Sequence, residues 1–127
     1  MTTPLITGVD FVAVPAKDFE ESVHFYGTVL GLPELKRWGS MPGCEFQVGN
    51  LTLAVMEPTA FGQAFEPHSL PIALQVDDVE AAREQLQSAG VEFAGETLDS
   101  GVCHQAFFKD PAGNTLDLHH RYAPKPD

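Results

Sequence analysis

The sequence predicts an α+β fold in which two βαβββ modules form two curved mixed sheets with a cleft between them. The first observation is a repeated helix start, because Asp18 and Asp78 lie 60 positions apart (78 − 18) and each precedes an apolar stripe at helical spacing. The second is a Gly-Asn turn at Gly49 and again at Gly113, each followed by a strand pattern. One helix covers only one face of a four-stranded sheet, so two such modules must share their burial and leave a cleft.

The first module is expected over residues of about 5–57. A β-branched apolar run predicts a strand over Ile6–Pro15. A helix then begins after the N-cap Asp18, with Glu21 three positions on as in a capping box, and Gly31 ends it. Three strands follow, over about Glu34–Trp38, Cys44–Val48 and Leu51–Glu57.

A linker over residues 58–70 joins the modules and carries two aromatic anchors, Phe61 and Phe65. The second module is expected over about 71–121, with a tail over 122–127, so that residues 1–127 form a single domain. Its helix begins after Asp78 and ends at Gly90. Its strands are expected over Pro71–Val76, Val91–Thr97, Val102–Lys109 and Thr115–Arg121.

Charge and composition narrow the range of partners. The chain has 7 basic and 18 acidic residues, a net charge of −11, which disfavours nucleic acid and anionic membranes. Neutral or cationic small organic molecules stay open as ligands. The start of the sequence has no basic n-region and the chain has no run long enough to span a membrane, so a cytoplasmic location is expected. In that compartment Cys44 and Cys103 should be free thiols.

Two polar side chains stand out in the last strand. Asp117 and His119 alternate with Leu116 and Leu118, and therefore share one face of the strand. A carboxylate and an imidazole in this arrangement could be half of a metal site, half of an acid–base pair, or the solvated face of a strand end. His104 lies in the preceding strand, and the cross-strand register that would place it is not readable from the sequence.

The sequence also resembles the vicinal oxygen chelate superfamily, which includes glyoxalase I, extradiol dioxygenases, and fosfomycin- and bleomycin-resistance proteins. The resemblance covers nearly the whole chain in both modules. The segments that carry it are Val14-x-x-x-Asp18-Phe19, Phe25-Tyr26 with Leu30-Gly31-Leu32, Ile72-Ala73-Leu74-x-Val76-x-Asp78-Val79, and Phe108-x-Asp110-Pro111-x-Gly113-Asn114-x-Leu116.

In metal-dependent members of this superfamily, four side chains project into the cleft and bind the metal. Carried over by position, the resemblance places Phe11, Leu53, Pro71 and Asp117 there. Three of these side chains offer no donor, and a single carboxylate does not hold a divalent ion. The resemblance therefore favours the metal-free type, with no cofactor. It also implies a homodimer.

Two chemical alternatives remain for the last strand. His104, Asp117 and His119 could form a displaced site for a divalent metal (Zn, Fe, Ni or Mn), because their donors suit such ions. Without a metal, His119 could act as a general acid or base oriented by Asp117 or His104. Either arrangement would make the protein a glyoxalase- or dioxygenase-like enzyme, a lyase, isomerase or oxygenase.

The favoured function is a small-molecule-binding protein that holds its ligand in the cleft. Gln75 should face the cleft, since it alternates with Pro71 and Ala73, and could form a hydrogen bond to a ligand. Aromatic side chains should make the cleft apolar. The residues expected to contact ligand are Phe11, Trp38, Leu53, Phe61, Phe65, Pro71 and Gln75.

Overall fold

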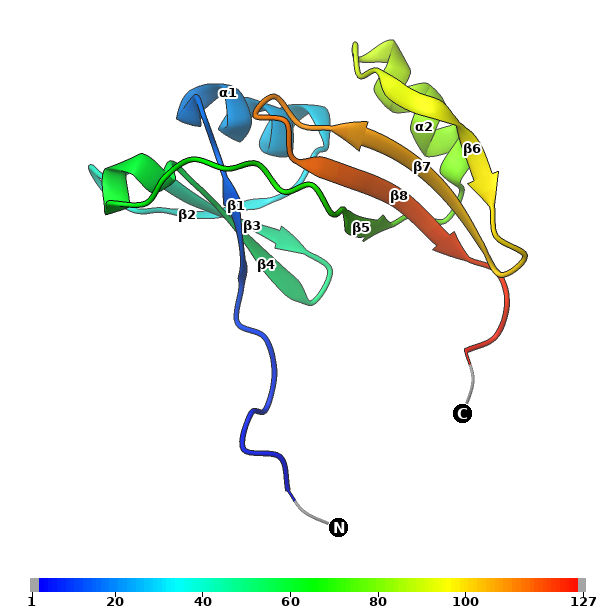
Figure 1. Cartoon of the computed structure of the whole chain (residues 1–127), viewed down its shortest axis with the longest axis horizontal. Coiled ribbons are helices and arrows are strands. Elements are labelled where there is room, and N and C mark those ends of the chain that lie inside the picture. Colours follow the sequence, from blue (N-terminus) through cyan, green and yellow to red (C-terminus); the bar gives the residue numbers. More distant parts are fainter. Residues whose placement is uncertain (1–2, 126–127) are drawn as a thin grey trace. The chain divides into compact units, whose positions relative to one another are not determined.

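The computed structural model describes residues 3–125 (Figure 1), so residues 1–2 and the last two of the predicted tail, 126–127, lie outside the described residues. The chain divides between Ala64 and Phe65 into two compact units. Each unit carries one four-stranded sheet and its own helix. No helix in the described range is both long and apolar enough to cross a membrane.

The first unit is a mixed sheet with the strand order β1-β4-β3-β2. β1 runs parallel to β4, and the other neighbouring strands are antiparallel. The helical segment between β1 and β2 therefore crosses from one edge strand of the sheet to the other, as in a βαβ crossover. The elements are β1 (Val12–Pro15), α1 (Phe19–His24), the π-helix η1 (Phe25–Val29), β2 (Glu34–Arg37), β3 (Gly43–Val48), β4 (Leu51–Met56) and the 3-10 helix η2 (Pro58–Phe61).

The helix of the first unit is fixed at its start and packs on one face of the sheet. The Asp18 carboxylate accepts a hydrogen bond from the backbone of Glu21 (3.1 Å), which caps α1. One turn later the Tyr26 ring lies 6.2 Å from that of Phe46 in β3. The face that carries Phe46 is the core of this unit, and its fully buried side chains are Val14, Cys44, Phe46, Leu53 and Val55.

The second unit repeats this plan with the order β5-β8-β7-β6, again with one parallel pair, β5 and β8. Its elements are β5 (Ile72–Gln75), α2 (Val79–Ser88), β6 (Phe93–Asp99), β7 (Cys103–Lys109) and β8 (Thr115–Arg121). Two copies of strand–helix–strand–strand–strand confirm the predicted α+β fold with two βαβββ modules.

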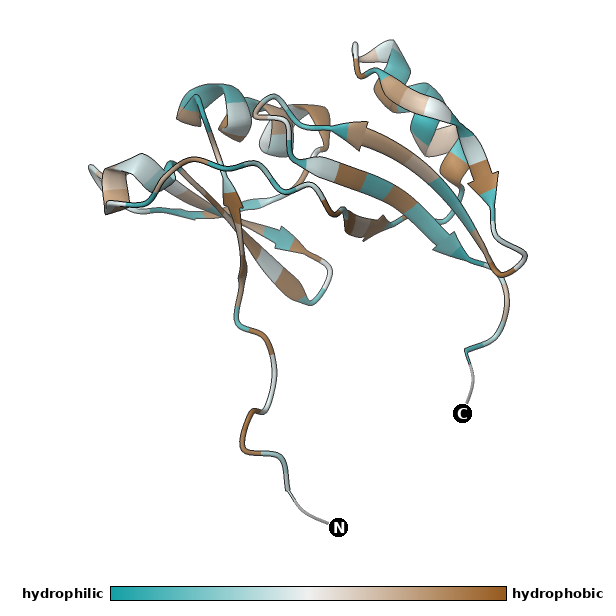
Figure 2. Ribbon diagram, in the orientation of Figure 1, coloured by the Kyte–Doolittle hydropathy of each residue, from teal (hydrophilic) through white to brown (hydrophobic). Residues whose placement is uncertain are grey.

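Side-chain contacts show which face of the second sheet α2 covers. Arg83 of α2 lies over the Phe93 ring, and Phe93 contacts Phe108. Phe108 pairs across the strands with Leu116, and both are buried. Within the described part of this unit, α2 is the only helix and does not pack on the opposite face of the sheet, which we call the open face. Figure 2 shows apolar and polar residues alternating along the first part of β8, as expected for a sheet with two unlike faces.

The loop of residues 110–114 fixes the register between β7 and β8. The carboxylate of Asp110 accepts hydrogen bonds from the backbone of Ala112 and Asn114, both at 2.9 Å, and from the Asn114 amide at 2.8 Å. Asn114 in turn accepts a hydrogen bond from the backbone of His68 (2.8 Å). Gly113 takes a φ of 93°, which favours glycine. The Asp-Pro-x-Gly-Asn segment thus forms a hydrogen-bonded turn whose two ends, Asp110 and Asn114, are buried.

Some predicted boundaries were wrong. The strand expected over Ile6–Pro15 is limited to β1, because β4 offers pairing partners only to Val12–Pro15. The helix after Asp18 is α-helical only to His24 and continues as η1. The linker also contains a short helix, η2, that was not predicted, whereas β8 has the bounds that were predicted.

Candidate functional site

The open face of the second sheet presents polar side chains in rows across β5, β8 and β7. Paired residues in neighbouring strands point to the same face of a sheet. Asp117 lies in the middle of one row and His119 in the middle of the next. The three rows are Ala73–Asp117–Phe107, Gln75–His119–Gln105 and Arg121–Cys103.

Asp117 is the most unusual group on this face. It is only 2% exposed, and its Oδ1 has no hydrogen-bond partner among residues 3–125. Burial raises the pKa of Asp117 from 3.8 to about 6, against the opposing effects of the nearby His119 and of a backbone hydrogen bond from Ala106. Leaving a buried acceptor unsatisfied costs about 1–3 kcal/mol. A ligand that donates a hydrogen bond to Asp117 would recover this energy.

The far end of the open face is hollow. A cavity of about 520 Å³ lies beside the end of β8 and exposes His119 and Arg121. Arg121 donates from Nη2 to the carbonyl of Pro124 (3.1 Å), while its buried Nε has no partner in the described part of the chain. The open face therefore combines an unsatisfied acceptor with an unsatisfied donor. The cavity is lined by Ala73, Gln75, Asp77, Cys103, His119, His120, Arg121, Ala123 and Lys125.

The donor set of the open face does not fit a resident divalent metal. The cross-strand neighbours of Asp117 are Ala73 and Phe107, neither of which has a side-chain donor. Across the described residues, no three His, Cys, Asp or Glu side chains are grouped so that they could hold a metal ion. Both cysteines are free and buried, and burial raises the pKa of the Cys44 thiol to about 11.

The structure does not bring His104 together with Asp117 and His119. His104 pairs with His120, so both belong to the face that α2 covers. His119 pairs instead with Gln105, on the open face. The register, which the length of the 110–114 loop determines, therefore separates His104 from the other two members of the alternative three-residue site. Asp117 and His119 do share a face.

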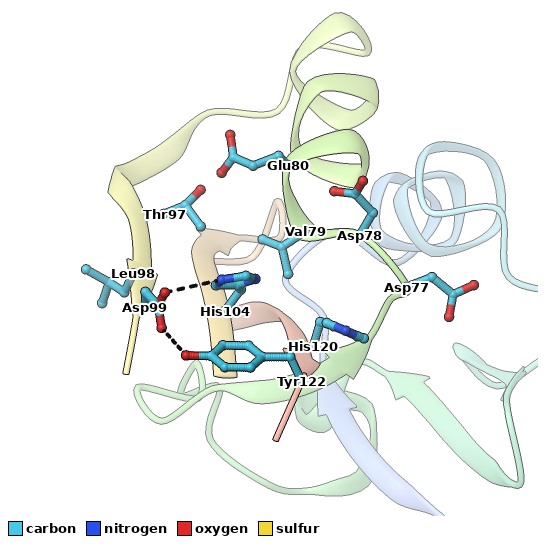
Figure 3. A pocket seen from close by; sticks show the side chains of 10 residues that line it. All are labelled: Asp77, Asp78, Val79, Glu80, Thr97, Leu98, Asp99, His104, His120 and Tyr122. Atoms are coloured by element: carbon cyan, nitrogen blue, oxygen red, sulfur yellow. Dashed lines mark hydrogen bonds and ion pairs between the residues drawn. The ribbon is translucent and has the colours of Figure 1, made fainter. Parts of the chain in front are cut away.

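His104 belongs to a second cavity, on the helix side of the same sheet (Figure 3). This cavity of about 540 Å³ lies between the start of α2, the end of β6 and Tyr122. Asp99 accepts hydrogen bonds from the Tyr122 hydroxyl (2.7 Å) and from the Gly101 backbone (2.9 Å), and it pairs with Nε2 of His104 (3.4 Å). Since these groups satisfy one another, they stabilise the strand ends without requiring a ligand. The open face, with its unsatisfied acceptor and donor, is therefore the better candidate for a ligand site.

Leu53 was also predicted on the wrong face. It pairs with Phe46 in β3, is fully buried, and belongs to the helix-covered core of the first unit. Counting forward from the two Gly-Asn turns caused the error, because the 49–50 turn is shorter than the 110–114 loop. A shift of one residue reverses the face of a strand. The strand pairing equates Leu53 with Leu116, since they pair with Val12 and Ile72.

The remaining predicted ligand contacts have mixed positions. Trp38 donates from Nε1 to Glu45 (2.7 Å) and contacts the Phe61 ring edge-on at 5.9 Å. Glu45 pairs with Ala54, so this aromatic pair lies on the face of the first sheet opposite to Phe46, where η2 contributes Phe61. Gln75 is on the open face of the second sheet and is exposed. Phe11 and Pro71 are exposed residues that immediately precede β1 and β5, and Phe65 is half-buried before β5.

Three residues of the open face were missed by the sequence analysis: Gln105, Phe107 and Arg121. Alternation along β7 already separates Gln105 and Phe107 from His104. The sequence does not give the cross-strand register, which places Gln105 and Phe107 on the same face as Asp117 and His104 on the opposite face. Arg121 shares the alternation of Asp117 and His119, so continuing the strand pattern by two residues would have found it.

Comparisons with known proteins agree with this architecture. The curated relative "Glyoxylase I 4" of Arabidopsis thaliana is 24% identical over 125 residues, which cover 89% of this chain and 70% of that protein. The solved structure of TnmS3, an antibiotic-binding protein from Streptomyces sp. CB03234, is 28% identical with a TM-score of 0.77, covering 94% of this chain and 99% of that one. A superfamily member from Sphaerobacter thermophilus is 21% identical with a TM-score of 0.78, covering 91% and 98%, and so supports the fold.

The family model matches residues 8–118, which is most of the chain. The match includes both sheets up to Leu118 in β8. The chain belongs to the Glyoxalase/Bleomycin resistance protein/Dioxygenase superfamily.

Proposed function

We propose that this protein binds a small organic molecule on the open face of the second sheet, without a resident metal. The observation that carries the proposal is the buried carboxylate of Asp117, whose Oδ1 lacks a partner within the described residues. A neutral or cationic ligand with a hydrogen-bond donor would satisfy it. The similarity to TnmS3, an antibiotic-binding protein, supports a binding role.

The surroundings of Asp117 suit a ligand with both polar and apolar parts. Phe107 offers a ring beside the carboxylate, and Gln75 and Gln105 flank His119 in the next row. Amides and imidazole can each donate or accept hydrogen bonds, so this row can match several polar groups. Few, well-placed polar groups around an apolar contact are typical of small-molecule sites.

Thermal unfolding in the presence of cationic compounds that contain aromatic rings tests the proposal. Benzylamine and bleomycin are suitable probes, because each offers cationic donors beside unsaturated rings. We expect a saturable rise in Tm, since a ligand that prefers the folded state stabilises it. The Asp117→Asn variant should lose most of this rise, whereas Asp99→Asn, on the helix side, should keep it. No rise with either probe, or an equal rise in the Asp117→Asn variant, would contradict the proposal.

The absence of a resident metal is part of the proposal and needs its own measurement. Metal analysis of protein purified without a histidine tag should find no stoichiometric Zn, Fe, Ni or Mn. Adding these ions should leave Tm unchanged, because the neighbours of Asp117 on its strand row offer no donors. Stoichiometric metal that disappears in a His119→Ala variant would require the metal-dependent alternative.

One observation favours an enzyme as the second candidate function. Burial raises the pKa of Asp117 to about 6, and His119 lies on the same face two residues on. A carboxyl group that titrates near neutral pH is suited to general acid–base catalysis. In this role Asp117 would exchange a proton with a bound carbonyl compound and His119 would orient the substrate. A metal-free, pH-dependent turnover lost in both Asp117→Asn and His119→Gln would establish it.

The proposal extends to assembly as a homodimer. Each sheet ends in edge strands, β1 and β2 in one and β5 and β6 in the other, and edge strands offer unpaired backbone groups to a second chain. Light scattering after size exclusion should give twice the mass of one chain. A cytoplasmic location stays a prediction from the sequence.

A further inference from the structure

The cavity at the end of β8 is a basic site in an acidic protein. The chain has only 7 lysines and arginines against 18 acids. Two of those seven, Arg121 and Lys125, line this cavity together with His119 and His120. Among the described residues that line it, the single acidic one is Asp77. The described lining therefore has a net positive charge, opposite in sign to that of the chain. Such a reversal of charge indicates an anionic ligand.

Within the described residues, the guanidinium of Arg121 donates one hydrogen bond and has further N–H groups that could donate to a ligand. Nη2 donates to the carbonyl of Pro124, which orients the group at the cavity wall. Nε is buried without a hydrogen-bond partner in the described range, and an unsatisfied buried donor is costly. A small rotation of the side chain toward the cavity would let Nε donate to a ligand oxygen. Arginine forms strong, often bidentate hydrogen bonds with carboxylates and phosphates.

We infer that this cavity binds a carboxylate group of the ligand, with Arg121 as the main donor and Lys125 as a second cation. A doubly charged phosphate fits less well, because Asp77 and the net charge of −11 oppose it. The inference rests on the proposed function, since the cavity belongs to the same open face. Arg121 lies four residues beyond Asp117, about 13 Å along the strand. The ligand class is therefore an elongated molecule with a hydrogen-bond donor at one end and a carboxylate at the other.

Two probes of the same shape, benzoate and benzamide, test the carboxylate site by nuclear magnetic resonance of the backbone amides. Benzoate should produce saturable shifts at Gln75, His119, Arg121 and Lys125. The affinity for benzamide should be lower by about tenfold or more, because benzamide lacks the charge that strengthens a hydrogen bond to arginine. Equal affinity for the two probes, or benzoate shifts confined to other parts of the chain, would overturn the inference.

Variants separate the role of Arg121 from general charge effects. Arg121→Gln should abolish the preference for benzoate over benzamide, and the exposed Lys125→Gln, which has little effect on folding, should reduce it a few-fold. Arg83→Gln removes the same charge on the helix side and should leave the preference intact. Tighter binding of inorganic phosphate than of benzoate would overturn the assignment to a carboxylate.

The outcome can be distinguished from that of the proposed function. If benzylamine binds through Asp117 but benzoate does not bind, only the carboxylate site is wrong. If benzoate binds at Arg121 but the Tm rise with benzylamine or bleomycin is absent, or is the same in Asp117→Asn as in the wild type, the carboxylate site is supported and the role of Asp117 is wrong.

Discussion

Asp117 combines two properties that oppose each other, since the group that offers a ligand contact also costs stability. Burial raises its pKa from 3.8 to about 6, so the folded state binds the proton more tightly than the unfolded state does. This contribution to stability is complete below pH 3.8 and is lost as the pH rises through about 6. Asp117→Asn should therefore raise the free energy of unfolding at neutral pH by on the order of 2 kcal/mol.

Chemical denaturation near pH 7.5 and near pH 3.5 measures this effect. At the lower pH the wild-type carboxyl is already protonated, and the two proteins should be equally stable. Asp99→Asn is the matched control, because hydrogen bonds from Tyr122 and Gly101 lower the pKa of Asp99 and so reverse the sign. A loss of stability in Asp117→Asn at neutral pH would mean that the contacts of the carboxylate outweigh the cost of its burial, and would remove the main support for the ligand site.

The same residues show how far the sequence reaches. Alternation alone placed Asp117 and His119 on one face, and the turn residues located β8 correctly. The separation of His104 from His119 depends on the number of residues between β7 and β8. The face on which Leu53 lies depends on the shorter turn between β3 and β4. Alternation gives the two faces of each strand but not which faces meet. That Asp117 Oδ1 has no partner among residues 3–125 depends on three-dimensional packing that no local pattern contains.

Among the elements, the β2–β3 hairpin depends on one glycine. The Trp38 ring lies directly over Gly43, and a Cβ at that position would overlap its Cε3 and Cδ2 atoms. Gly43→Ala should therefore displace the indole from Glu45 and Phe61, lower Tm, and cost about 1–3 kcal/mol. Trp38 is the single tryptophan of the chain, so its emission reports the displacement directly.

Gly8→Ala is the control for this prediction. No atom lies within 4 Å of a Cβ at Gly8, which precedes β1 in an exposed segment. Its Tm and emission should match the wild type. Unchanged Trp38 emission in Gly43→Ala would show that the hairpin accommodates the methyl group, and that the aromatic pair is not held by this contact.

For the whole molecule, the repeated βαβββ module explains the fold, and the net charge of −11 affects its stability. Each unit packs a helix on one face of its sheet, and in the second unit the candidate site lies on the opposite, open face. In the second unit that face holds Asp117 at one end and Arg121 at the other. A ligand that spans both would be amphoteric. This accounts for a basic cavity in a chain whose net charge is −11.

That net charge predicts how the fold responds to salt. With 18 acidic and 7 basic residues, carboxylates repel one another in the compact state more than the ion pairs of Arg37 with Glu20 and Glu34 can offset. Raising ionic strength from about 0.01 M to about 0.1 M shortens the screening length from roughly 30 Å to roughly 10 Å. Tm at neutral pH should rise over this range, as scanning calorimetry can measure. Near pH 4.6, the isoelectric point of the sequence, the net charge is close to zero and the same salt should change Tm little. A fall in Tm at neutral pH would instead mean that attractive pairs dominate.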